Sequence, residues 1–143
     1  MPLMFLKSNR TLQLCLLACG LVTAVGCTSE VKTHPVIGKV LLPSGTPAQR
    51  GLVEFRTTTA EGEVVNAHGK IEPDGSFRLS TFAEHDGALA GEHQAIVLNP
   101  ATDDGGPAHR AVYPERYSAY ESSDLKFEIQ PGPNEIVVQL KAK

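Results

Sequence analysis

The chain has no tryptophan, and its three cysteines, Cys15, Cys19 and Cys27, all lie near the N-terminus. The remainder of the chain therefore offers no disulfide framework, no cysteine zinc site and no cysteine nucleophile. A formal net charge of −3 excludes the basic surface that nucleic-acid binding requires. With 143 residues, of which 41% are hydrophobic and 20% charged, the composition is typical of one globular domain.

Acidic residues are absent before Glu30, whereas Lys7 and Arg10 give the N-terminus positive charge. Residues 11–26 are mostly apolar, and as a helix they would extend only about 24 Å at ~1.5 Å per residue. Because a bilayer core is about 30 Å thick, this run fits the helix of a signal peptide better than a spanning helix. We expect residues 1–26 to be a signal peptide, whose removal changes the net charge from −3 to −5 because two cations leave.

Small residues precede the third cysteine in the sequence Ala24-Val25-Gly26-Cys27. This segment resembles the lipobox of bacterial lipoproteins, except that Ala24 stands where leucine is usual. The resemblance implies that Cys27 is lipidated, which would supply the two or more acyl chains that stable anchoring needs. Leu16-Leu17-Ala18-Cys19 is a second candidate lipobox. An ordinary secretory signal or an uncleaved anchor remains the alternative.

The residues after Cys27 predict where the protein lies. Thr28 stands where an aspartate would indicate retention in the inner membrane, so the outer membrane is favoured. Residues 27–33 would form a tether of which the last six residues reach about 20 Å, at ~3.3–3.6 Å each. We therefore expect a domain of residues 34–143 held close to the membrane of a bacterial cell envelope.

From residue 34 onward, apolar and polar residues alternate between frequent turn signals, a pattern typical of strands. Asp74-Gly75 is the strongest hairpin signal, because glycine accepts the positive φ of tight turns. No segment in this region has helical periodicity. The pattern predicts an all-β fold, an antiparallel two-sheet sandwich of about seven strands. The expected strands are 34–42, 52–57, 64–71, 76–80, 95–98, 125–129 and 135–140.

Several short motifs follow one another along residues 34–142. They are Val36-x-Gly38-x-Val40, Gly45-x-Pro47, Val53-x-Phe55, Asp74-Gly75-x-Phe77-x-Leu79, Asp86-Gly87-Ala88, Gly91-Glu92-His93-x-Ala95-x-Val97, Pro114-x-x-Tyr117, Ser123-x-Leu125 and Asn134. In the order and spacing of these motifs, the chain resembles the carboxypeptidase-regulatory-like, transthyretin-type β-sandwich lipoproteins of planctomycete bacteria. That resemblance implies an immunoglobulin/transthyretin-like sandwich and an envelope location, and it implies no activity.

Known catalytic and metal-binding patterns are not found. The five histidines form no H-E-x-x-H pair, and no serine stands in G-x-S-x-G. The Tyr-Arg-Gly-Ser ending of the transthyretin-type hydroxyisourate hydrolase is replaced by Gln139-Leu140-Lys141-Ala142-Lys143. Asp103-Asp104-Gly105-Gly106 lacks the alternating ligands of a calcium loop and fits a solvated turn. We expect no enzyme activity, no metal and no cofactor.

Residues 99–123 form a long irregular segment that contains all three tyrosines, and such segments are usually functional or disordered. Tyr113, Arg116, Tyr117 and Tyr120 are candidate interaction residues, because tyrosine and arginine are enriched at interface hot spots. The alternative is that the rings cover the end of the sandwich core.

These observations favour a membrane-anchored lipoprotein whose sandwich is a structural or protein-interaction module, with another envelope protein as partner. A module that binds a glycan or small ligand is the alternative, although carbohydrate modules commonly use tryptophan platforms. A transthyretin-type hydrolase is the third hypothesis.

Overall fold

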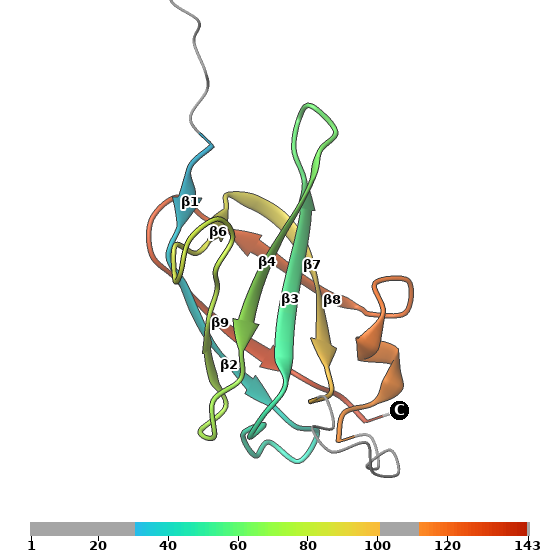
Figure 1. Cartoon of the computed structure of the whole chain (residues 1–143). Coiled ribbons are helices and arrows are strands. Elements are labelled where there is room, and N and C mark those ends of the chain that lie inside the picture. The colour runs from blue at the N-terminus through green and yellow to red at the C-terminus, as the bar shows by residue number, and fades with distance from the viewer. Residues whose placement is uncertain (1–30, 101–111, 143) are drawn as a thin grey trace, which may run out of the picture. The chain divides into compact units, whose positions relative to one another are not determined.

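The computed structural model describes residues 31–100 and 112–142. The expected signal peptide and the candidate lipidation residue Cys27, together with Asp103-Asp104-Gly105-Gly106, lie outside these residues. The described chain consists of strands, turns and one short 3-10 helix, η1 (Glu115–Ser118) (Figure 1). The strands are β1 (Thr33–His34), β2 (Val36–Leu41), β3 (Leu52–Thr58), β4 (Val64–Lys70), β5 (Ser76–Arg78), β6 (Ala88–Leu89), β7 (Gly91–Leu98), β8 (Leu125–Ile129) and β9 (Asn134–Gln139).

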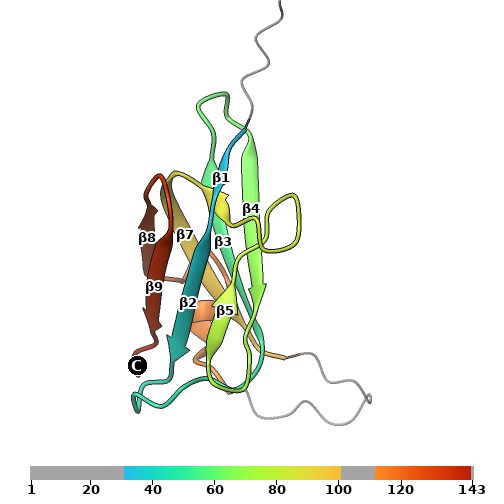
Figure 2. The same cartoon turned by 90° about the vertical axis from the view of Figure 1, so that its left-hand side faces the viewer.

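The all-β sandwich predicted from the sequence is confirmed. A four-stranded antiparallel sheet in the order β4-β3-β7-β8 packs against a three-stranded sheet in the order β5-β2-β9, and a short β1-β6 pair completes the fold (Figure 2). No helix among the described residues is long and apolar enough to cross a membrane.

One strand pairing departs from the antiparallel sandwich expected from the sequence. β2 and β9 run parallel, with Val36 opposite Asn134 and Leu41 opposite Gln139. These strands come from opposite ends of the described domain, so their mutual direction depends on packing between distant parts of the chain. Local alternation reports only which face of a strand is buried, and it carries no information about the direction of the neighbouring strand.

The Asp74-Gly75 turn is present, but the hairpin that it predicted is not. Gly75 has a φ of +84°, and the Glu72 N–H donates to the Ser76 carbonyl across the turn. The flanking strands then separate into different sheets, because β5 pairs with β2 and β4 pairs with β3. β4 is joined to the chain after β5 only by an isolated bridge between His68 and Ser80.

The core lies between the two larger sheets and follows the alternation of the sequence. Phe55 is its centre, stacked on Phe127 with ring centroids 5.3 Å apart and tilted against Phe77 at 6.1 Å. Gly38 is required beside this cluster, since a Cβ atom there would lie 2.3 Å from the Phe77 ring. Other buried apolar residues include Val36, Val40, Val53, Ala67, Ile71, Leu79, Val97, Leu125, Ile129, Ile136, Val138 and Leu140.

Candidate interaction surface

Two of the three tyrosines singled out from the sequence belong to the core. Tyr113 and Tyr117 are 2% and 0% exposed. The Tyr113 hydroxyl donates to the carbonyl oxygen of Arg50, and burial raises the pKa of its phenol despite this bond. The Tyr117 hydroxyl accepts the backbone N–H of Lys141 at 2.9 Å. Each ring therefore packs in the end of the sandwich core, and neither is exposed to a binding partner.

The third tyrosine joins the same segment to the outer face of the four-stranded sheet. The Tyr120 hydroxyl donates to Glu54 Oε1 at 2.8 Å, and the Arg56 guanidinium lies 3.7 Å above the centroid of its ring. Gln94 donates to the Tyr120 carbonyl at 2.6 Å. Burial, with the Glu54 carboxylate second, raises the pKa of the Tyr120 phenol well above its ordinary value. Tyr120 is thus a partly buried structural link.

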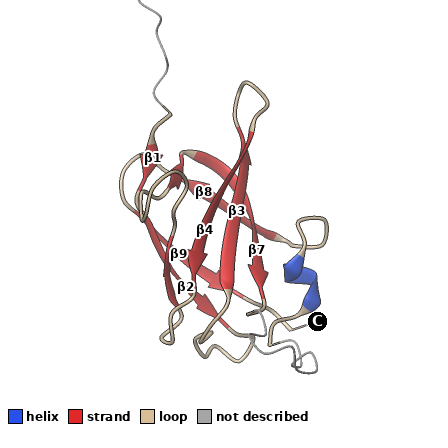
Figure 3. Ribbon diagram, in the orientation of Figure 1, coloured by secondary structure: helices blue, strands red, loops and turns tan. Residues whose placement is uncertain are grey.

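Arg116 lies in η1, which Figure 3 shows as a single short turn beside the strands. Its guanidinium stacks on the Tyr117 ring at 4.6 Å and donates to the Tyr117 hydroxyl and the Lys141 carbonyl. These contacts hold the C-terminal end of the domain against η1. They leave the side chain little freedom to bind another protein.

The hypothesis that Tyr113, Arg116, Tyr117 and Tyr120 form an interaction loop is therefore wrong for Tyr113 and Tyr117, which are buried, whereas Arg116 and Tyr120 are partly buried. The physical reason is the length of β8. It pairs with β7 only as far as Ala95, so the C-terminal end of β7 has no β8 residue beside it. The irregular segment covers this end through η1, which packs against β7. The alternative weighed from the sequence, that the rings cover the end of the core, describes Tyr113 and Tyr117.

A different surface exposes apolar side chains. On the outer face of the β5-β2-β9 sheet, Ile37 is 48% exposed and Val137 is 57% exposed. Both line a shallow hollow of about 340 Å³ that lies over β2 and its two neighbouring strands. Six side chains of this hollow point outward, and we define the β2–β9 face by the five that are apolar or charged, namely Ile37, Lys39, Arg78, Glu135 and Val137; the sixth is Ser76.

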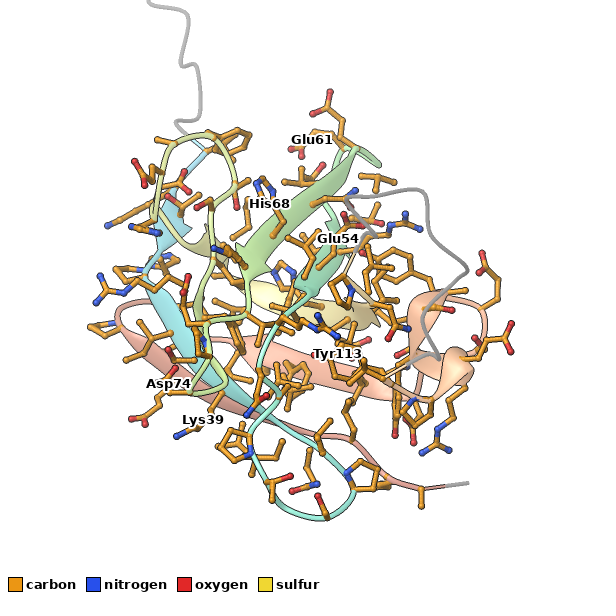
Figure 4. All side chains as sticks on the ribbon, turned by 60° about the horizontal axis from the view of Figure 1, so that its bottom comes forward. Lys39, Glu54, Glu61, His68, Asp74 and Tyr113 are labelled. Atoms are coloured by element: carbon orange, nitrogen blue, oxygen red, sulfur yellow. The ribbon has the colours of Figure 1, made fainter. Side chains whose placement is uncertain are left out.

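Charged residues flank the apolar pair of the β2–β9 face in a regular way. The register places Arg78 and Glu135 on opposite sides of Ile37, and Lys39 directly beside Val137. Asp74 lies near Lys39 at the same end of the sheet (Figure 4). Hydrogen bonds from Ser76, with a smaller contribution from Lys39, lower the pKa of the exposed Asp74 carboxyl. An apolar centre with charges of both signs at its rim is the usual pattern of a protein interface.

The edge of this face is open, because β9 is the last strand of its sheet among the described residues. The N–H groups of Asn134 and Leu140 donate to the carbonyls of Pro35 and Leu41. Since successive residues of a strand turn their backbone groups to opposite sides, the N–H and C=O of Glu135, Val137 and Gln139 point away from β2. A strand edge of this kind is a template for another extended segment.

The sequence contains a signal for this face. Val36-Ile37 and Val137-Val138 are consecutive apolar pairs in strands, and one member of each must turn outward. A second hollow, of about 510 Å³, lies at another part of the surface and is lined by Leu42, Thr46, Pro47, Gln49, Arg50, Pro73 and Val112. Its lining contains no acid or histidine that could act as a general base for the Thr46 hydroxyl.

The histidines of the described chain are spread over separate elements. His34 accepts the N–H of Gly132, and His93 is buried against Phe55. His68 lies opposite Glu54 on the exposed face of β4, as the labelled side chains in Figure 4 show. No group of three or more metal-binding side chains occurs within residues 31–100 and 112–142.

No family model matches the chain, and no curated protein matches it. Among solved structures, the chain is similar to the crystal structure of the major plantain pollen allergen Pla l 1. The two share 12% identity over 78% of this chain and 98% of that chain, with a TM-score of 0.36. This likeness is too distant to indicate a function.

Proposed function

We propose that the protein is a lipid-anchored protein of the bacterial envelope, whose sandwich binds a partner protein and catalyses no reaction. The lipobox-like segment that ends at Cys27 supports the anchor, and the resemblance of the motif order to planctomycete sandwich lipoproteins agrees with it. The observation that carries the binding role is the exposed pair Ile37 and Val137 beside the open edge of β9.

The partner we propose is an extended segment of another envelope protein. Such a segment would pair with the outward backbone groups of β9, and hydrogen bonds of this kind supply affinity in β-strand addition. Its alternate side chains would lie next to Val137 on the β2–β9 face. The charges of Lys39, Arg78 and Glu135 would then select its sequence, since rim charges set specificity more than affinity.

A glycan module receives less support from the same residues. Sugar binding on the irregular segment would need exposed rings, and both Tyr113 and Tyr117 are in the core. The β2–β9 face has no aromatic side chain among its outward residues. For a transthyretin-type hydrolase, the described histidines do not converge with an arginine on one cleft.

The register allows a test that separates edge binding from folding. A photo-reactive residue at position 37 of the full chain should cross-link a partner in the native envelope. Val137→Pro removes one outward N–H and leaves the bonds of β9 to β2, because the N–H groups of Ile136 and Val138 are the ones that face β2. Val137→Thr, which keeps the N–H, is the matched control.

We expect the cross-linked partner to be lost in Val137→Pro and retained in Val137→Thr, with both variants folded by circular dichroism. A photo-reactive residue at Val64, which is 61% exposed on the other sheet, should not capture the same partner. Cross-linking that persists in Val137→Pro, or that is equal at positions 37 and 64, would overturn the binding role of this face.

A further inference from the structure

The turn between β5 and β6 is held by one carboxylate. Asp86 accepts the backbone N–H groups of Thr81 at 2.7 Å, Phe82 at 3.0 Å and Ala83 at 3.1 Å. Two further side chains close the turn, since Ser80 Oγ accepts the N–H of His85 and Thr81 donates to the carbonyl of Gly87. We call residues 80–87 the Asp86 turn. So many bonds within eight residues give it a defined conformation.

This turn exposes a large apolar side chain. Phe82 is 64% exposed, more than any other large hydrophobic residue described. An apolar ring of this size normally gains stability by burial, so a fixed turn that leaves it in water is suited to present it to something else.

The Asp86 turn lies beside the β1-β6 pair, in the half of the sandwich where the described chain begins (Figure 1). β6 follows the turn directly and pairs with β1, and Gly87 packs so closely on His34 that a Cβ atom would meet its carbonyl oxygen at 1.8 Å. Val31, two residues before β1, is 55% exposed. Phe82 and Val31 thus lie on elements joined by the β1-β6 pair.

The length of chain before Val31 limits what can face this end. From Cys27 to Val31 there are four residue steps, which extend at most about 14 Å at ~3.3–3.6 Å each. If Cys27 carries the acyl chains, the end of the sandwich that holds Val31 must stay within that distance of the lipid. The surface most available to Phe82 is then the membrane itself.

We propose that Phe82, with Val31, inserts into the interfacial layer of the membrane to which Cys27 is anchored and so fixes the orientation of the sandwich. The inference rests on the proposed lipid anchor. The exposed charged or titratable residues here are Lys32, Glu84 and His85. His68, which pairs with Ser80, is also exposed, and the β3-β4 hairpin adds Glu61 and Glu63. Because these charges do not sum to a basic patch, the contact is apolar and should not weaken in salt.

The absence of tryptophan allows a direct measurement. Phe82→Trp in the full lipidated chain introduces a single indole, and Val137→Trp is the matched control, because Val137 is 57% exposed on the side of the sandwich. Each protein is reconstituted in phosphatidylcholine vesicles that contain a brominated phosphatidylcholine. Flotation of the vesicles and the intact mass of the protein report the anchor independently of the fluorescence.

We expect blue-shifted emission and several-fold stronger quenching by the brominated lipid for Phe82→Trp than for Val137→Trp, in low and high salt alike. Equal quenching of the two variants in vesicles that carry the protein would overturn the inference and leave the anchor standing. A chain that neither floats with the vesicles nor carries acyl groups would overturn the proposed anchor, and the inference with it.

Discussion

The Tyr120 hydroxyl donates to the Glu54 carboxylate over 2.8 Å and thereby ties the irregular segment to β3. Tyr120→Phe removes the donor and should lower the free energy of unfolding by about 1–2 kcal/mol, since both groups are only partly buried. Urea unfolding measures the change. In a double-mutant cycle, Glu54→Gln should lose much of its effect when Tyr120 is already Phe. Strict additivity of the two changes would contradict the link.

A substitution at Tyr117 tests whether the irregular segment is part of the core. Tyr117→Ala leaves a cavity and should cost about 3–5 kcal/mol, as for other large buried side chains. Alanine at Tyr113, Tyr117 and Tyr120 together should therefore unfold the domain, whose total stability is expected to be about 5–15 kcal/mol. Circular dichroism distinguishes this loss of fold from a mere loss of binding. A folded triple variant would return these side chains to the interaction hypothesis.

The free energy of unfolding should depend on pH through the buried imidazole of His93. Burial lowers the pKa of its imidazole below 6.5, although a hydrogen bond to the Leu89 carbonyl and the charge of Glu128 act in the opposite direction. The unfolded chain therefore takes up the proton first as pH falls. Stability contributed by the neutral ring is present above about pH 6.5 and decreases below it.

Urea unfolding midpoints between pH 5 and 8 measure this dependence. His93→Leu should flatten the decrease below pH 6.5, while costing about 1 kcal/mol at pH 7 through the lost bond to Leu89. His68→Gln, on the exposed face of β4, is the control for the loss of a histidine elsewhere in the domain. An unchanged pH profile in His93→Leu would show that another group is responsible.

Gly87 and Gly132 have nearly the same backbone angle, with φ of +93° and +97°, but different surroundings. A Cβ at Gly87 would meet the His34 carbonyl oxygen at 1.8 Å, whereas nothing lies within 4 Å of one at Gly132. Both alanine variants should lose about 1–3 kcal/mol through the positive φ. Only Gly87→Ala should also disrupt the β1-β6 pair, which hydrogen exchange would detect. Equal effects of the two variants would contradict the close packing.

The local pattern predicted the strands well, because burial acts residue by residue. Val53 and Phe55 in β3, and Ile136 and Val138 in β9, face the core as their alternation indicates. What the pattern could not supply was the pairing of β2 with β9, since nothing near Val36 specifies a partner about 100 residues away. Direction and sheet membership depend on these distant contacts.

The candidate site was harder to predict for a related reason. Tyrosine and arginine in an irregular segment indicate an interface as readily as a cover for the core, and composition alone does not distinguish the two. The length of β8 decides it, because β8 covers β7 only as far as Ala95 and η1 packs on the part beyond. Alternation identifies the buried valines Val36 and Val138, but it does not show that their outward neighbours Ile37 and Val137 line one hollow on the same sheet.

Anchoring of the sandwich through Cys27 can be measured as the intact mass of the protein purified from native membranes. We expect a mature chain that begins at Cys27 and carries acyl groups, and a Cys27→Ala variant that remains unprocessed. A chain that begins at Cys19, or one with an unmodified N-terminus elsewhere, would show that Cys27 is not the anchor and would remove the short tether on which the membrane contact of Phe82 depends.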